Sequence, residues 1–355
     1  MDDMQIKEFD AEEVRDVAFW LSVEDYIMAL AVPAPAAQTA RRFITWRAAP
    51  CIVIGKYQIA EAEVDLAEAR RRHVDVTRRS SGGGAVFIDP GAVQYAMIEP
   101  FAPGMGEDAM RAARTDVAGV VARALKQQFG VPASVEGRND VTVNGAKVSG
   151  LSQLTRGGWL NTHGTLLYDS DLDILSKLLK PDTAKFQSKA VQSVRSRVLN
   201  VRPLLGGRDA GGAGAFMKEF SAAVMSDADS RGRPLIGFTP TLRQLGEIEK
   251  TRIEVYANPL NTYSKSPPYT YRAARRFPGG KVEFFADVKV GVLSSCAIRG
   301  DFIGSAAIEA LENKFCGLPF RMEAFESAVS DGAVKDCLGG ITKAEFLNFL
   351  FSDEK

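Results

Sequence analysis

The chain has 355 residues, of which 46% are hydrophobic and 25% are charged. It is long enough to bury a sizeable core, and its length indicates two domains or one large domain with an appendage. Its 44 basic residues balance 44 acidic ones, so no net charge favours nucleic acid as a partner.

The first third of the chain alternates helix and strand patterns. The apolar stretch 14–37 contains charged residues and prolines, which excludes a signal peptide and a membrane span. We expect a helix over 11–31 capped by Asp10, strands at 42–46 and 51–54, a helix at 60–72, strands at 74–79, 85–88 and 93–98, and a helix at 108–129.

Two tight hairpins follow. Asn144-Gly145 lies between β-branched runs, which predicts a two-residue turn with Lys147 on the return strand. The glycines after Arg156 predict a second turn, leading into a strand at 162–169. A helix is expected at 171–179.

The last third changes character after a Pro- and Ser-rich stretch at 258–270 that is typical of a linker. Before it we expect helices at 216–225 and 241–256. After it we expect strands at 271–277, 281–289 and 292–299 and helices at 304–314, 319–328 and 342–351. These patterns predict an α+β protein with mixed sheets, divided into domains at 1–257 and 258–355.

Residues 78–89 read RRSSGGGAVFID, with three consecutive glycines between arginines and an apolar strand. Glycines let a ligand approach the backbone N–H groups closely, a geometry that suits an anion or phosphate. Arg78 and Arg79 are expected to contact the same group. A plain hairpin turn is the alternative. Neither the P-loop nor the G-x-G-x-x-G pattern fits.

Three motifs together, RRSSGGGAVF, GRNDVTVNGAKVSG (137–150) and HGTLL (163–167), resemble those of lipoate-protein ligases. LSVED (21–25), SKAVQSVRSRV (188–198), KSPPYTYRAARRFPGG (265–280) and GGITKAEFLNFLF (339–351) extend the similarity. The resemblance implies a large catalytic domain of the biotin/lipoate ligase type and a small C-terminal accessory domain.

The resemblance also implies the chemistry. Lipoate, ATP and Mg²⁺ would give lipoyl-adenylate, whose acyl group passes to a lysine of a lipoyl-domain protein. Lys147 of the K-V-S-G motif would contact the lipoyl carbonyl and the α-phosphate, where a fixed cation lowers the barrier. An exposed hairpin lysine is the alternative.

The other site residues come from the same motifs. ATP and the adenylate would be bound by Arg79, Gly82, Gly83, Gly84, Ala85, Val86, Phe87, Asn139, Asp140 and Lys147. Lipoate would be bound by Lys147, Gly83, His163 and Gly164. Asp140 would reach the phosphates through Mg²⁺, unless it only caps a turn. His163 would position the substrate.

Three departures from the family pattern concern the acyl substrate. Ile88 stands where a histidine is common, GAVQYA (91–96) replaces an asparagine-rich run, and Leu151 follows K-V-S-G. Because of these departures, the sequence leaves open whether the enzyme prefers lipoate or octanoate.

Alternatives remain at this point. An octanoyl or lipoyl transferase needs a cysteine near the lysine, yet the chain has no cysteine between Lys147 and Cys296, and Cys51 lies in an apolar strand. A biotin-protein ligase has a different glycine loop. A noncatalytic lipoate or nucleotide carrier would bind without turnover.

Scattered cysteines suggest a reducing cytoplasm. We expect a monomer without nucleic-acid or membrane partners, whose linker lets the C-terminal domain move after adenylation.

Overall fold

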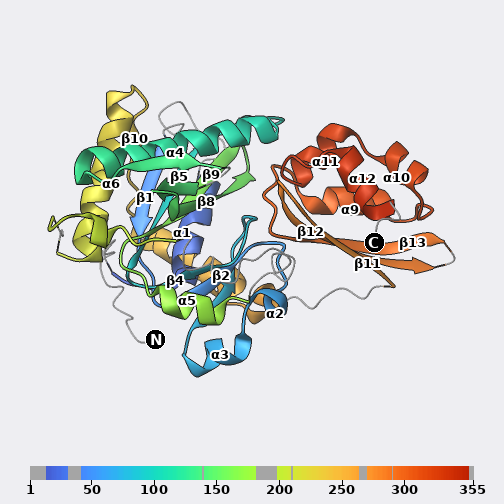
Figure 1. Ribbon diagram of the computed structural model, residues 1–355, viewed down its shortest axis with the longest axis horizontal. Coiled ribbons are helices and arrows are strands. Elements are labelled where there is room, and N and C mark those ends of the chain that lie inside the picture. The colour runs from blue at the N-terminus through green and yellow to red at the C-terminus, as the bar shows by residue number, and fades with distance from the viewer. Residues whose placement is uncertain are drawn as a thin grey trace.

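The computed structural model describes residues 13–30, 41–137, 140–180, 198–208, 211–263, 270–289 and 291–351. They form a large domain and a small C-terminal domain beside it (Figure 1). No helix in these ranges is long and apolar enough to cross a bilayer.

The large domain is built on a seven-stranded sheet in the order β10-β1-β5-β9-β8-β7-β6. Most neighbours are antiparallel, whereas β1 and β10 run parallel. The strands are β1 (Arg41–Trp46), β5 (Ala92–Pro100), β6 (Ala133–Glu136), β7 (Asp140–Val143), β8 (Ala146–Arg156), β9 (Trp159–Leu167) and β10 (Leu235–Ile236).

Two helices, α4 (Glu107–Phe129) and α6 (Ala213–Ser230), cover one face of this sheet (Figure 1). Their apolar side chains pack with those of the strands in a core that includes Val93, Val117 and Phe220. Burial of this face stabilises the sheet on which the site residues lie.

The opposite face is covered by helix α1 (Val17–Leu30) and a smaller sheet. That sheet has the order β3-β2-β4, with strands β3 (Asp75–Arg78), β2 (Cys51–Ile54) and β4 (Val86–Ile88). The glycine loop joins β3 to β4, so it lies where the two sheets of the large domain face each other.

The remaining elements of the large domain are short. They are α2 (Ala60–Glu63), α3 (Leu66–Arg71), α5 (Leu172–Leu178), the 3-10 turn η4 (Arg202–Leu204), α7 (Leu242–Thr251), the π-helical turn η5 (Arg252–Tyr256) and α8 (Pro259–Thr262). The expected helix at 241–256 is thus confirmed as a helix that ends in a wider turn. Thr241 begins it with a capping box shared with Gln244.

The small domain packs three strands against four helices around its own core. The elements are β11 (Tyr271–Phe277), β12 (Gly280–Lys289), β13 (Val292–Gly300), α9 (Ile308–Phe315), α10 (Met322–Ala328), α11 (Asp331–Cys337) and α12 (Lys343–Phe351). The expected α+β unit is confirmed. Helix α11 was not expected, since its short DGAVKDC sequence lacks a helical apolar stripe and its start is marked only by the Ser330 cap.

Two expected helices have wrong boundaries. Helix α1 begins at Val17, because the Asp16 carboxylate accepts the Phe19 N–H at 2.9 Å and ends the extended chain there. The expected cap Asp10 lies outside the described residues. The single helix expected at 60–72 is two helices, since Asp65 accepts from Ala67 and Glu68 and starts a new helix.

The expected linker at 258–270 begins as structure rather than as a free segment. Asn258 caps α8, and Arg78 donates to the carbonyls of Asn261 and Thr262 at 2.7 Å. Arg78 also donates to three carbonyls of the 55–58 turn. The expectation that Arg78 contacts an anion is therefore wrong, because its buried guanidinium is occupied by the backbone.

Candidate active site

A cavity of about 300 Å³ lies between the two sheets of the large domain, beside α1. Its wall includes polar groups, among them Arg79, Lys147 and His163. The rest is mainly apolar and includes Val17, Leu21, Trp46, Val53, Val86, Ile88, Leu151, Leu167, Leu175 and Leu179. A mainly apolar wall that also includes two cations suits an apolar ligand that carries an anionic group.

The glycine loop forms the wall of the cavity nearest the small domain. Gly83 has a φ of 87°, a conformation that side chains rarely adopt. Its N–H donates to the carbonyl of Phe302 at 3.1 Å, so the small domain contacts the loop directly. A Cβ atom at Gly82 would lie 2.3 Å from the same Phe302 oxygen. Glycine at these positions therefore permits contact between the domains.

The Arg79 side chain holds the glycine loop in place through hydrogen bonds to main-chain carbonyls. Its guanidinium donates to the carbonyls of Val53 at 3.1 Å, Gly82 at 2.6 Å and Gly84 at 2.8 Å. Burial lowers its pKa to about 10. Arg79 is therefore charged at neutral pH, and it presents a positive charge at the cavity while holding the loop closed.

The residues after the glycines differ in what they offer a ligand. A Cβ atom at Gly84 would meet nothing within 4 Å, so space is open there. Ala85 and Val86 are partly buried and line the cavity. Phe87 is 3% exposed and packs in the core with Ile52 and Ile54. Phe87 is also among the residues that line the cavity.

Lys147 lies on β8 after the predicted Asn144-Gly145 turn, where both turn residues have positive φ. Its ammonium forms an ion pair with Asp140 at 2.7 Å. A Cβ atom at Gly150 would be 2.5 Å from the Lys147 Nζ. The missing side chain at Gly150 thus provides the space that the ammonium occupies.

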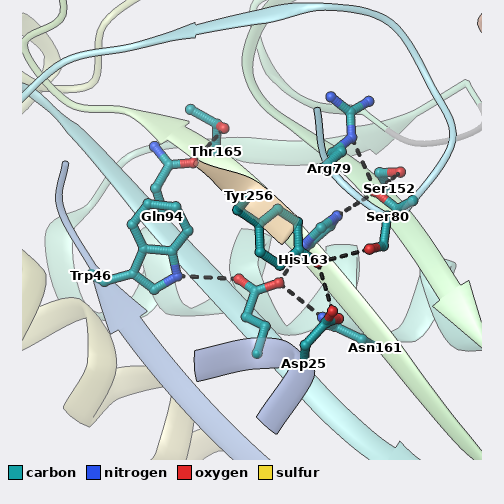
Figure 2. A network of polar contacts seen from close by, with 12 residues as sticks. Asp25, Trp46, Arg79, Ser80, Gln94, Ser152, Asn161, His163, Thr165 and Tyr256 are labelled. Atoms are coloured by element: carbon teal, nitrogen blue, oxygen red, sulfur yellow. Dashed lines mark hydrogen bonds and ion pairs between the residues drawn. The ribbon is translucent and has the colours of Figure 1, made fainter. Parts of the chain in front are cut away.

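His163 is held by a chain of hydrogen bonds from both sides (Figure 2). Its Nδ1 lies 2.6 Å from the Glu24 carboxylate, and its Nε2 lies 2.7 Å from the Ser81 hydroxyl. Because a carboxylate only accepts, Nδ1 carries a ring proton. In the neutral ring Nε2 therefore accepts the Ser81 proton, which ties β9 to the glycine loop.

Glu24 is buried and also accepts from Trp46 Nε1 at 3.2 Å and Asn161 Nδ2 at 2.9 Å. Three donors from two strands therefore fix the Glu24 carboxylate of α1. Glu24 belongs to the LSVED motif, but the sequence alone assigns it no role. No local pattern indicates that role, because the residues that contact Glu24 come from distant parts of the chain.

Gly164 lies beside the buried Tyr95. A Cβ atom at Gly164 would be 2.4 Å from the Tyr95 hydroxyl, which is 2.8 Å from the Ser149 hydroxyl. Gly164 therefore contributes main chain to the cavity, and the Tyr95 ring packs against Phe220 in the core on the other face of the sheet. Ile88 and Leu151, which depart from the family pattern, are both 3% exposed and line the cavity.

The comparisons with known proteins agree with this arrangement. A family model described as the lipoyl protein ligase A/B catalytic domain matches residues 16–226, more than half of the chain. A second model, the bacterial lipoate protein ligase C-terminus, matches residues 266–350. The chain belongs to the lipoate-protein ligase family.

One relative supports this membership, and two solved structures share the fold. The lipoate-protein ligase LplJ of Bacillus subtilis is 30% identical over 85% of this chain and 88% of its own length. The structure of LipL1 from P. falciparum in complex with lipoate has a TM-score of 0.71 at 21% identity, covering 88% of this chain and 91% of that one. The structure of a lipoate-protein ligase A bound with ATP has a TM-score of 0.56 at 20% identity. The match covers 71% of this chain and 99% of that one.

As a member of this family the protein is an enzyme, a ligase with the expected two-domain α+β fold. The transferase alternative requires a thiol beside Lys147, but none of the four cysteines, all of which are described, is among the residues that line the cavity with Lys147. Cys51 is buried, and burial raises the pKa of its thiol well above the usual value. An inert core cysteine was the prediction for this position, and the structure confirms it.

Two predicted site features are less complete. Asn139 lies outside the described residues. Within those residues, no group of three or more His, Cys, Asp or Glu side chains is placed to hold a metal ion. Asp140 is a single carboxylate paired with Lys147. This donor set fits an ion that takes most of its ligands from phosphates and water, as Mg²⁺ does.

Proposed function

We propose that Lys147 and the glycine loop catalyse the formation of lipoyl-adenylate from lipoate and ATP. One observation carries the proposal: Lys147 and Gly83 line the same cavity, whose remaining wall is largely apolar. A fixed ammonium beside backbone N–H groups suits a carboxylate that attacks a phosphate. The apolar wall suits the acyl chain.

In the first step, a lipoate oxygen forms a bond to the α-phosphorus as the bond to the pyrophosphate leaving group breaks. Negative charge grows on the phosphate oxygens, and Lys147 Nζ neutralises it together with the charge of Arg79. Gly84, Ala85, Val86 and the main chain of Phe87 would hold the nucleotide. Asp140 would hold a Mg²⁺ ion, which supplies charge neutralisation on the phosphates.

In the second step, the amine of an acceptor lysine attacks the acyl carbonyl and AMP leaves. Lys147 would polarise that carbonyl, while His163 and Gly164 position the acyl group. The acceptor would be a lipoyl-domain protein, such as a 2-oxoacid dehydrogenase subunit, a glycine-cleavage H protein or a specialised lipoyl carrier. We expect a monomer that works in a reducing cytoplasm, where free cysteines are typical.

The small domain would move between these steps. It contacts the glycine loop through Phe302, and the acceptor needs access to the adenylate. We expect the moving unit to begin beyond α8, since Arg78 holds residues 261 and 262 to the large domain.

The test is pyrophosphate release with ATP and lipoate. Lys147→Ala should lower the rate by about 10²–10³, the usual loss for a group that stabilises transition-state charge. Lys250→Ala removes a lysine whose side chain is 73% exposed, and it should leave the rate unchanged. An unchanged rate in Lys147→Ala would contradict the assignment of Lys147. Lipoate binding without pyrophosphate release would instead favour a carrier.

A mass-shift assay with a panel of lipoyl domains would then identify the acceptor. An added lipoyl group on one domain, lost when its target lysine is replaced, is the expected result. Pyrophosphate release without a mass shift on any domain would contradict the transfer step alone.

A further inference from the structure

Among the described residues that line the cavity, Gln94 has a side-chain nitrogen that neither the adenylation chemistry nor the fold uses. Gln94 on β5 is 3% exposed and lines the cavity. Its Oε1 accepts from the Thr165 hydroxyl at 2.6 Å. Its Nε2 is buried and has no hydrogen-bond partner in the described structure. An unpaired buried donor is costly, so its position calls for a partner that the ligand supplies.

The place of Gln94 follows from strand pairing. Gly150 pairs with Thr165, Thr165 with Gln94, and Gln94 with Trp46. Directly paired residues point to one face of a sheet, so these four form a row across β8, β9, β5 and β1. Figure 2 shows Gln94 between Thr165 and the Trp46 ring.

The row begins at the reactive cation. Lys147 Nζ lies over Gly150, 2.5 Å from where a Cβ atom would be. Gln94 is two strands further along, which is about 10 Å at the usual strand spacing. That separation matches the length of a medium-chain acyl group whose carboxyl end is at Lys147. The far end of such a chain would lie at Gln94.

We propose that Gln94 is a specificity residue that donates a hydrogen bond from Nε2 to an acceptor at the far end of the acyl chain. A dithiolane sulfur of lipoate can accept this bond, although weakly, whereas the methyl end of octanoate cannot. Octanoate would therefore bury the donor unpaired and bind less well. This inference rests on the proposed function, because it takes Lys147 as the position of the carboxyl end.

The anchoring of the amide supports a selective role. Thr165 holds the carboxamide by its oxygen and leaves the nitrogen for the ligand. A glutamine free to turn would adapt to either chain. A held donor instead penalises a chain without an acceptor, which is how buried polar groups discriminate between analogues.

The experiment compares kcat/KM for pyrophosphate release with lipoate and with octanoate. Gln94→Met keeps the approximate shape and removes the donor. The kcat/KM for lipoate divided by that for octanoate should fall by about tenfold, because the value for octanoate rises and that for lipoate falls. If Gln94→Met does not fold, Gln94→Leu also lacks the donor and should show the same fall.

Gln127→Met is the matched control. It makes the same change at an exposed glutamine of α4, so the ratio should stay within about twofold of the parent enzyme. An unchanged ratio in the Gln94 variants would overturn the proposal, as would an equal fall in Gln127→Met. If neither acid supports pyrophosphate release in the parent enzyme, the proposed function fails instead.

Discussion

The backbone N–H of Gly83 donates to the carbonyl of Phe302 at 3.1 Å, so the small domain occupies a donor of the glycine loop. The rings of Phe302 and Tyr57 stack beside this contact at 5.0 Å, and the Gly300 N–H donates to the Tyr57 carbonyl. A nucleotide phosphate that takes the Gly83 N–H must displace this contact. We therefore expect occupation of the loop by the adenylate to favour release of the small domain.

Gly82→Ala tests the contact between Gly83 and Phe302. Its Cβ atom would lie 2.3 Å from the Phe302 oxygen, and Gly82 does not have a positive φ, so the clash with the small domain is the main effect. We expect the Gly83 amide to exchange with solvent about tenfold faster in hydrogen-exchange measurements. Gly84→Ala is the control, because its Cβ atom meets nothing within 4 Å. Equal exchange in both variants would contradict the contact.

Glu24→Gln tests the network around His163. Glutamine replaces one carboxylate oxygen by an amide nitrogen, which donates and does not accept. At least one of the three donors that contact Glu24 would therefore lose its acceptor. We expect the free energy of unfolding to fall by about 2 kcal/mol, measured in urea, and the KM for lipoate to rise. Glu254→Gln changes a carboxylate that is 61% exposed and should alter stability by less than about 0.5 kcal/mol. Comparable stability of the two variants would refute the network.

Alkylation with iodoacetamide near neutral pH tests the absence of thiol chemistry. Burial raises the pKa of the Cys51 thiol well above its usual value and that of Cys337 to about 11, whereas Cys316 is exposed. We expect peptide mapping to find the label at Cys316 and pyrophosphate release to be unchanged. Labelling of Cys51 with a parallel loss of activity would revive the transferase mechanism.

Glu63→Gln tests a pH dependence of stability. Burial raises the pKa of the Glu63 carboxyl, with the Lys281 charge opposing the shift. The folded state therefore holds its proton to higher pH than the unfolded state does, so stability from this group is lost as pH rises through the folded pKa. The variant should unfold at a higher temperature than the parent at pH 7 and lose that advantage near pH 4.

Glu68→Gln should behave in the opposite sense. Hydrogen bonds from Arg71 and Arg72 lower the pKa of Glu68, so its charged form favours folding above the unfolded pKa. This variant should unfold at a lower temperature than the parent at pH 7, and the two unfolding temperatures should become equal in acid. The same sign for both variants in thermal melts would contradict the assigned causes.

Local signals predicted the parts of the site that depend on neighbours in sequence. The Asn144-Gly145 turn placed Lys147 on its return strand, and the glycine loop lies between β3 and β4 as expected. Arg78 shows where such reasoning fails. An arginine beside glycines suggests an anion contact, but carbonyls of residues 261 and 262, far along the chain, take its donors.

Long-range partners account for the other omissions. Glu24 sits in a helix whose apolar pattern was predicted, yet three donors from β1 and β9 determine its role. Gln94 was noted only as a departure from the family pattern. Its unpaired nitrogen becomes visible once β1, β5, β8 and β9 are placed side by side.

Lys147 and Asp140 belong to one β-hairpin, with β7 and β8 joined by a two-residue turn. Contacts between near neighbours in sequence form early in folding, because little chain entropy is lost in closing the loop. The cation can therefore meet its counterion before the acyl cavity exists. Mutations elsewhere in the large domain would then damage the shape of the cavity while sparing the ion pair of Lys147 with Asp140.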